Sequence, residues 1–183
     1  GYGGFDAAKH AAQKGLKVAI VESKEMGGTC VNKGCVPSKA LLAASGKVRE
    51  IANYDHLSKL GIHSAPVRFE RSKIAEHANN LVLNIRENLT KTLLRNGVEI
   101  IRGIGRIEAH QKVGVRDKNG IDKILKCKNI IIATGSSPFV PRGIEIDKQT
   151  VFTSDEAVKL DWLPKWIAII GSGYIGLEFA DVY

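Results

Sequence analysis

The sequence has few cysteines, no cluster of basic charge and no long apolar run. Three cysteines among 183 residues are too few for the disulfide framework of a small secreted domain. The formal net charge is +8, yet no two lysines or arginines are adjacent and no basic stripe alternates with aromatic residues. A nucleic-acid surface is therefore not expected. No apolar run approaches the ~18 residues that a membrane span needs, although 44% apolar residues allow a packed core and exclude disorder.

A complete glycine-rich motif lies near the end of the sequence. Gly171, Gly173 and Gly176 form G-x-G-x-x-G between the apolar run 166–170 and a helix-compatible segment. A strand that leads through such a turn into a helix directs backbone N–H groups and the positive helix end at a pyrophosphate. The motif predicts a dinucleotide site. Its acidic ribose ligand is expected about 20 residues later, beyond Tyr183, so NAD and NADP are not distinguished.

The first residues repeat this pattern without its first glycine. Gly1 and Gly4 match the second and third glycines, and a helical segment and a strand follow. Glu22 stands at the end of that strand, where an acidic side chain accepts hydrogen bonds from a ribose. A glycine-rich helix cap without a ligand is the alternative. Two such units in one chain predict two dinucleotides.

The residues between these motifs predict two helices followed by strands. Apolar spacing predicts helices over 35–53 and 70–96, the second ended by Gly97. Residues 98–133 alternate and turn, which predicts a β-meander that returns to the sheet through a buried strand in "NIIIATG", residues 129–135. The expected fold class is α/β, with a Rossmann-like dinucleotide domain and its meander over residues 1–143. A linker and the start of a second Rossmann-like domain follow over 144–183.

Two of the cysteines, Cys30 and Cys35, lie close together in "GGTCVNKGCVPSKALL". On a regular helix their separation is near ~9 Å, whereas a disulfide joins Cα atoms roughly 4.4 to 6.8 Å apart. A disulfide therefore needs a bend, which Gly34 tolerates. A metal site lacks further ligands, and a structural disulfide that closes so small a loop stabilises little. A redox-active pair is the favoured interpretation, with a thiolate favoured by the start of the following helix.

The cysteine segment resembles the redox-active segment of the flavin-dependent pyridine nucleotide disulfide oxidoreductases. Its "PSKALL" is more similar to the dihydrolipoamide dehydrogenases of that family than to the glutathione reductases. "IIIATGSSPFVP" is similar to the segment that closes over FAD, and "SDEAVKL" with "IAIIGSGYIGLEF" is similar to the entry to the NAD domain. Together with "LLAASGKVREI" and "TVFTSDEAVKL", these runs are most similar to the plastid and cyanobacterial type. The resemblance implies oxidation of protein-bound dihydrolipoamide to lipoamide and reduction of NAD⁺ to NADH, through a Cys30–Cys35 disulfide and FAD.

The resemblance also implies individual roles for residues. Cys30 matches the interchange thiol that reacts with the substrate, and Cys35 matches the thiol that lies against the flavin. The residues expected to bind FAD are Gly1, Gly4, Glu22, Gly28, Thr29, Lys39, Gly105, Thr134, Gly135 and Ser136. The residues expected at the NAD site are Gly171, Gly173, Tyr174, Ile175, Gly176 and Glu178.

One pair among these residues carries a specific geometric prediction. Lys39 follows Cys35 by four residues and so shares its helix face. The resemblance implies that Lys39 and Glu178 form an ion pair beside the flavin, and physical chemistry favours it because each charge offsets the cost of burying the other. Two unrelated surface charges are the alternative. No metal ligands are predicted.

The partners and location implied by the resemblance are those of the family. The expected partners are lipoyl domains of 2-oxo acid dehydrogenase complexes or of the glycine cleavage system. The full-length protein is expected to be a homodimer, and its expected location is the plastid stroma or the cyanobacterial cytoplasm. A glutathione or mercuric reductase, a non-catalytic nucleotide-binding module and a structural subunit are the alternatives. Because the first FAD glycine and everything after Tyr183 are missing from the pattern, we expect a piece of a longer enzyme. Alone, it should neither hold FAD tightly nor turn over dihydrolipoamide.

Overall fold

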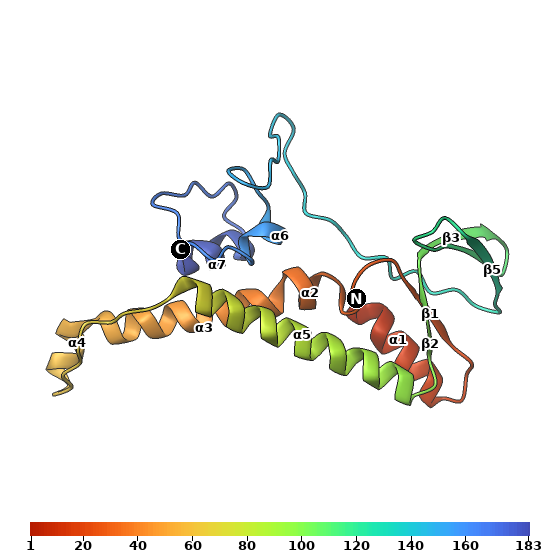
Figure 1. Ribbon diagram of the computed structural model, residues 1–183, viewed down its shortest axis with the longest axis horizontal. Coiled ribbons are helices and arrows are strands. Elements are labelled where there is room, and N and C mark those ends of the chain that lie inside the picture. Colours follow the sequence, from red (N-terminus) through yellow and green to blue (C-terminus); the bar gives the residue numbers. More distant parts are fainter. The chain divides into compact units, whose positions relative to one another are not determined.

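A computed structural model describes residues 1–183, and its contacts divide the chain into two units. The first unit contains Gly1–Asn32 and Leu83–Ser137, and the second contains Lys33–Val82 and Pro138–Tyr183. The long helix α5, Arg71–Arg95, contributes to both (Figure 1). This division differs from the domain boundary expected at residue 143, which stays a prediction.

The first unit is built on a parallel pair of short strands. Helix α1 (Tyr2–Gln13) leads to strand β1 (Ala19–Glu22), which pairs in parallel with β2 (Glu99–Arg102). Parallel strands need a long crossover connection, and the chain supplies it through α2 (Gly28–Lys33) and the helices that follow. The core of this unit consists of the buried residues Phe5, Ala8, Met26, Val31, Leu89, Leu93, Val98 and Val115. Strand β1 thus ends at Glu22, as the sequence predicted.

The long helix confirms the predicted periodicity and its end. Leu89 and Leu93 lie one turn apart and are both buried, as an apolar helix stripe requires. At its end, Gly97 has a φ of 73°, and the Val98 N–H donates to the carbonyl of Leu93 at 3.1 Å. This is the left-handed glycine cap that ends many helices.

The predicted meander is formed. Strands β3 (Ile104–Ala109), β4 (Lys112–Arg116) and β5 (Asp122–Lys126) form an antiparallel sheet in that order. Arg116 and Asp122 are register partners, and the guanidinium donates two hydrogen bonds to the carboxylate at 2.9 and 2.8 Å. These hydrogen bonds and the positive charge of Arg116 lower the pKa of Asp122.

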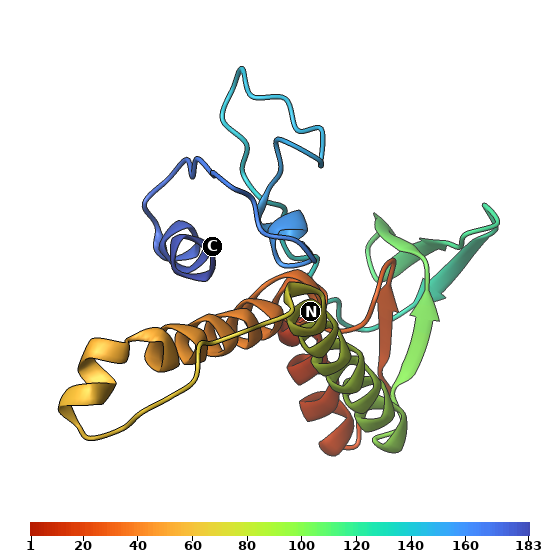
Figure 2. The same ribbon diagram turned by 60° about the vertical axis from the view of Figure 1, so that its left-hand side comes forward.

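Two predicted strands are not formed, namely those over 129–135 and 166–170. Both segments run without strand hydrogen bonds (Figure 2), and Ile132 and Ile170 are 71% and 77% exposed. The physical reason is that a strand needs a neighbouring strand to pair its N–H and C=O groups. The parallel sheet contains β1 and β2 alone, so neither segment has such a neighbour. The expectation that 129–135 is a buried strand was therefore wrong for this chain.

The second unit consists of helices and connecting segments. Helix α3 (Cys35–Ala52) is followed by α4 (Tyr54–Lys59), and α6 (Ser154–Ala157) and α7 (Tyr174–Val182) lie near the end of the chain. Helix α7 packs against α3. Ala157, Val158 and Phe179, from the end of α6 and from α7, form a small core, with Phe152 and Tyr183 packed on it.

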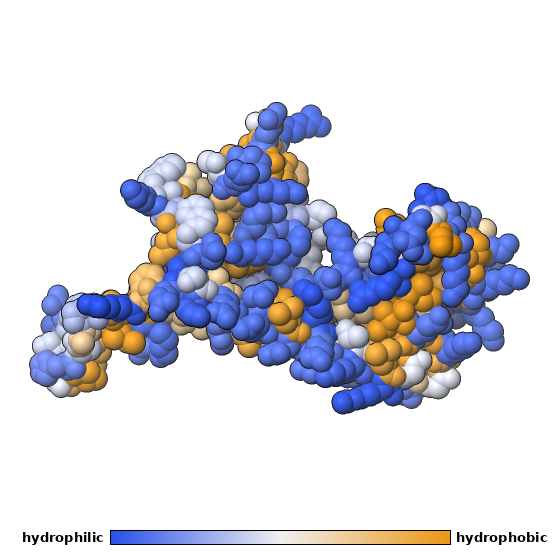
Figure 3. Space-filling model, in the orientation of Figure 1, coloured by the Kyte–Doolittle hydropathy of each residue, from blue (hydrophilic) through white to orange (hydrophobic).

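Apolar side chains also remain on the surface. Figure 3 shows hydrophobic atoms over the strands of the first unit, where Ile104, Ile107 and Ile124 are more than half exposed. None of the helices combines the length and apolar character needed to cross a membrane.

Candidate dinucleotide and redox site

The start of α1, the end of β1 and the start of α2 meet in the first unit. Gly28 has a φ of 62°, and a Cβ placed on it would lie 2.4 Å from the Cα of Gly1. The Glu22 carboxylate accepts a hydrogen bond from the Lys24 N–H at 3.0 Å, and its other oxygen lies 3.8 Å from the amino group of Gly1. The structure thus brings together Gly1, Glu22 and Gly28, three of the residues expected to bind FAD.

Two further segments that contain residues expected to bind FAD lie against α1 and β1. A Cβ on Gly4 would lie 3.4 Å from the Cβ of Ala133, the residue that precedes Thr134, Gly135 and Ser136. A Cβ on Gly105 would lie 3.3 Å from the Val21 side chain. The glycines therefore allow the helix, strand and loops to approach closely, and an acidic side chain ends the strand. This arrangement fits a dinucleotide.

The segment that contains the two cysteines is bent, as a disulfide between them would require. Cys30 lies in α2 and is half-buried, whereas Cys35 is exposed and is the first residue of α3. Between the two helices, Gly34 has φ −133° and ψ −119°, a conformation outside the α and β regions of other residues. Both cysteines are thiols in the structure. Their pairing in a disulfide stays a prediction.

The connection between the cysteines is held by a residue that the sequence did not single out. Lys33 Nζ lies 2.7 Å from Oδ2 of Asp155 in α6. Helix α6 begins with a capping box, in which Thr153 and Glu156 bond each other's backbone N–H groups. Burial acts to raise the pKa of Glu156, but the hydrogen bonds from the side chain and backbone of Thr153 outweigh it and lower this pKa. The sequence signal for this cap is the T-x-x-E pattern at residues 153–156.

The expected ion pair between Lys39 and Glu178 is confirmed. Lys39 Nζ lies 2.5 Å from Oε1 of Glu178, which joins α3 to α7 across 139 positions of sequence. Ser38 was not predicted, yet its hydroxyl donates to the other carboxylate oxygen of Glu178 at 3.3 Å. The pair is partly open to solvent, because the Lys39 side chain is 60% exposed. Its place beside a flavin stays a prediction.

A double-mutant cycle measures this pair. Lys39→Ala and Glu178→Ala should each lower the free energy of unfolding by less than about 1 kcal/mol, since solvent-exposed pairs contribute little. The double variant should lose less than the sum of the two. In the full-length protein, each single variant should also slow reduction or reoxidation of the flavin. Chemical denaturation and stopped-flow absorbance measure the two effects, and strictly additive losses would remove the pair from the mechanism.

The second glycine motif has the expected turn and helix without the preceding strand. Gly171 has a φ of 108°, and Gly173 is the N-cap of α7. A Cβ on Gly176 would lie 2.2 Å from the carbonyl oxygen of Gly171, so only glycine fits there. Tyr174 and Ile175 are 76% and 44% exposed at the start of the helix. The first turn of α7 is therefore exposed, and its contact with a nucleotide stays a prediction.

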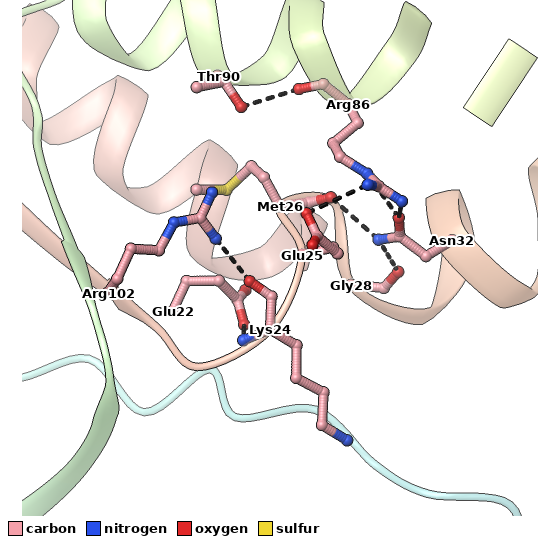
Figure 4. A network of polar contacts seen from close by, with 9 residues as sticks. All are labelled: Glu22, Lys24, Glu25, Met26, Gly28, Asn32, Arg86, Thr90 and Arg102. Atoms are coloured by element: carbon pink, nitrogen blue, oxygen red, sulfur yellow. Dashed lines mark hydrogen bonds and ion pairs between the residues drawn. The ribbon is translucent and has the colours of Figure 1, made fainter. Parts of the chain in front are cut away.

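A further polar network surrounds the loop between β1 and α2 (Figure 4). Arg102 of β2 donates to the carbonyl of Lys24, and Arg86 of α5 bonds Asn32 of α2. No motif in the sequence marked Arg86 or Asn32. The structure contains no group of three or more His, Cys, Asp or Glu side chains arranged to hold a metal.

Two glycine turns of the dinucleotide-binding type with a cysteine pair between them are the pattern of the nucleotide-dependent disulfide oxidoreductases. The chain belongs to the pyridine nucleotide-disulphide oxidoreductase family, whose sequence model matches residues 1–183. The family uses FAD and NAD. The predicted family, fold class and cofactors are thereby confirmed.

Named relatives make the comparison more specific. The chain is 61% identical to a protein named dihydrolipoyl dehydrogenase from Synechocystis, and 55% identical to dihydrolipoyl dehydrogenase 2, chloroplastic, from Arabidopsis thaliana. Both matches cover 100% of this chain but 38% and 31% of the relatives. The structure of the flavoprotein disulfide reductase RclA from Escherichia coli matches with a TM-score of 0.80 and 26% identity, over 98% of this chain and 37% of that chain. The chain thus spans less than two-fifths of the length of these proteins.

Proposed function

We propose that the full-length protein is a dihydrolipoyl dehydrogenase, which oxidises protein-bound dihydrolipoamide to lipoamide and reduces NAD⁺ to NADH. The observation that carries the proposal is the pair Cys30 and Cys35 on either side of the bend at Gly34, in a chain with both nucleotide turns. The names of the two relatives support the choice of dihydrolipoamide among disulfide and dithiol substrates.

The proposed chemistry begins with thiol exchange on a Cys30–Cys35 disulfide. A substrate thiolate attacks the sulfur of Cys30, and Cys35 leaves as a thiolate. The second substrate thiol then displaces Cys30, so the substrate leaves as a cyclic disulfide and both cysteines are reduced. When bound, FAD supplies the two-electron carrier between the thiol pair and NAD⁺. The sum is dihydrolipoamide plus NAD⁺ giving lipoamide, NADH and a proton.

The remaining site residues bind and orient in this proposal. Glu22 would accept hydrogen bonds from a ribose of FAD, and the backbone N–H groups at the start of α1 would hold its pyrophosphate. The turn from Gly171 to Gly176 does the same for NAD⁺. The bond between Lys39 and Glu178 holds both charges in place at the meeting of α3 and α7.

The proposed partners and location follow from the same names. Lipoyl domains of 2-oxo acid dehydrogenase complexes or of the glycine cleavage system present the substrate, and the full-length protein acts as a homodimer. Relatives from a cyanobacterium and from a chloroplast support a place in the plastid stroma or in the cyanobacterial cytoplasm.

The test is a substrate comparison with the purified full-length protein. NADH formation is followed at 340 nm with dihydrolipoamide and NAD⁺, and pyridine nucleotide oxidation is followed with glutathione disulfide and with Hg(II). We expect turnover with dihydrolipoamide at least 100-fold above that of the other two. Preference for glutathione disulfide or Hg(II) would assign a related reductase, and absence of flavin absorbance would assign a non-catalytic module.

A further inference from the structure

Arg86, in the middle of α5, is the centre of the network around the loop that precedes α2 (Figure 4). Its Nε and Nη2 donate to Oδ1 of Asn32 at 3.0 and 2.8 Å, and its Nη1 lies 3.2 Å from Oε2 of Glu25. The Arg86 side chain is 27% exposed. One guanidinium therefore joins α5 both to the loop and to the helix that carries Cys30.

Asn32 extends this contact to the backbone of the loop. Its Nδ2 donates to the carbonyl oxygens of Met26 at 3.0 Å and Gly28 at 2.9 Å. The amide thus uses both donor hydrogens while its oxygen accepts twice from Arg86, which satisfies the whole group in a single orientation. Met26 is fully buried, and Gly28 is the residue whose backbone meets Gly1. The Arg86–Asn32 contact therefore determines how the loop enters α2.

The loop and the short helix α2 cannot hold this geometry by their own interactions alone. Gly27 and Gly28 both adopt positive φ, 102° and 62°, and glycines lose the most conformational freedom on ordering. Helix α2 has six residues, far fewer than a helix needs to be stable by itself. The position of Cys30, two residues before Asn32, consequently depends on contacts from outside the segment.

We infer that Arg86 is a positioning residue for Cys30, and that it acts through Asn32 rather than on the substrate or cofactor. The inference rests on the proposed function, because it concerns the Cys30–Cys35 disulfide. Four residues separate the two cysteines, so an α2 that is released from α5 lowers the effective concentration of one thiol at the other. The disulfide then forms less favourably and is reduced more easily. Arginine is required because its planar fork bonds Asn32 and Glu25 together, which a lysine ammonium does not do.

The test is the thiol–disulfide equilibrium of the cysteine pair in the full-length protein. Wild type, Arg86→Ala, Arg86→Lys and Arg86→Gln are equilibrated with oxidised and reduced dithiothreitol, and the thiols are then trapped and counted by mass spectrometry. We expect the equilibrium constant for disulfide formation to fall about tenfold in all three variants, a shift of about 30 mV toward easier reduction. Lys91→Ala is the matched control, because Lys91 pairs with Glu87 on the exposed surface of the same helix. Its equilibrium constant should stay within twofold of wild type.

Three outcomes separate the inference from its premises. If wild type forms no Cys30–Cys35 disulfide, the proposed function fails. If wild type forms it and the Arg86 variants stay within twofold, the positioning role alone is wrong. If Arg86→Lys retains the wild-type value while Arg86→Ala does not, charge matters rather than the fork, and the inference is also overturned. Asn32→Ala should reproduce the effect, and the Arg86→Ala/Asn32→Ala double variant should add less than twofold to it.

Discussion

Serine in place of Cys30 will stop oxidation of dihydrolipoamide by the full-length protein, with a loss of about 1,000-fold or more in kcat, while FAD remains bound. The reason is that the hydroxyl of serine neither forms nor exchanges a disulfide at neutral pH. Serine in place of Cys35 will stop turnover as well. We also expect a long-wavelength thiolate-to-flavin absorbance in the two-electron-reduced wild type. Cys35→Ser should abolish this absorbance, and Cys30→Ser should retain it. Steady-state assays and anaerobic spectra measure these effects.

Alkylation of the reduced wild type distinguishes the two thiols directly. In the structure Cys35 is exposed and Cys30 is half-buried, so brief iodoacetamide treatment of FAD-free protein should label Cys35 first. With FAD bound, the order should reverse, because the proposed flavin covers Cys35 and leaves Cys30 for the substrate. Peptide mass spectrometry reads the order. Faster labelling of Cys35 in the FAD-loaded protein would contradict the roles assigned to the two cysteines.

Alanine in place of Gly28 will abolish FAD binding, with a loss of at least 100-fold in affinity. An added Cβ would lie 2.4 Å from Gly1 Cα and 3.0 Å from Gly1 N, both backbone atoms that do not rotate away. The φ of 62° adds a cost of roughly 1 to 2 kcal/mol for any residue other than glycine. The turn must therefore open where the pyrophosphate is expected. The flavin-to-protein absorbance ratio and a fluorescence titration of the FAD-free protein measure the loss.

The control is Gly46→Ala in α3, because nothing lies within 4 Å of a Cβ at that position. It should bind FAD as wild type does, and the helix should gain stability from the replacement. Circular dichroism should show Gly28→Ala folded, so that loss of FAD is not loss of the fold. Normal FAD affinity in a folded Gly28→Ala protein would place the cofactor elsewhere.

Local patterns allowed much of the site to be predicted. The helix over α5 and its end at Gly97 follow from apolar spacing and one glycine, which act within a few residues of one another. The bend at Gly34 follows from the spacing of two cysteines that are expected to form a disulfide. The glycines of both nucleotide turns are equally local, because each is required by the backbone around it.

The pair between Lys39 and Glu178 was predicted through the family resemblance, since nothing local links residues 139 positions apart. Ser38, which bonds the same carboxylate, carried no such signal. The isoleucine-rich run before Thr134 has the composition of a buried strand, yet it lies exposed because strand formation depends on a neighbour to pair with.

The sequence by itself determined the family of this protein and the residues of its proposed chemistry, because two cysteines and two glycine turns form patterns at short range. Only the tertiary structure decided what holds that chemistry in place. Arg86 lies 54 positions from Asn32, and their contact depends on how α5 packs beside the loop before α2. A hydrogen bond between distant residues arises from tertiary packing rather than from local residue spacing, so no periodicity or motif in the chain predicted it.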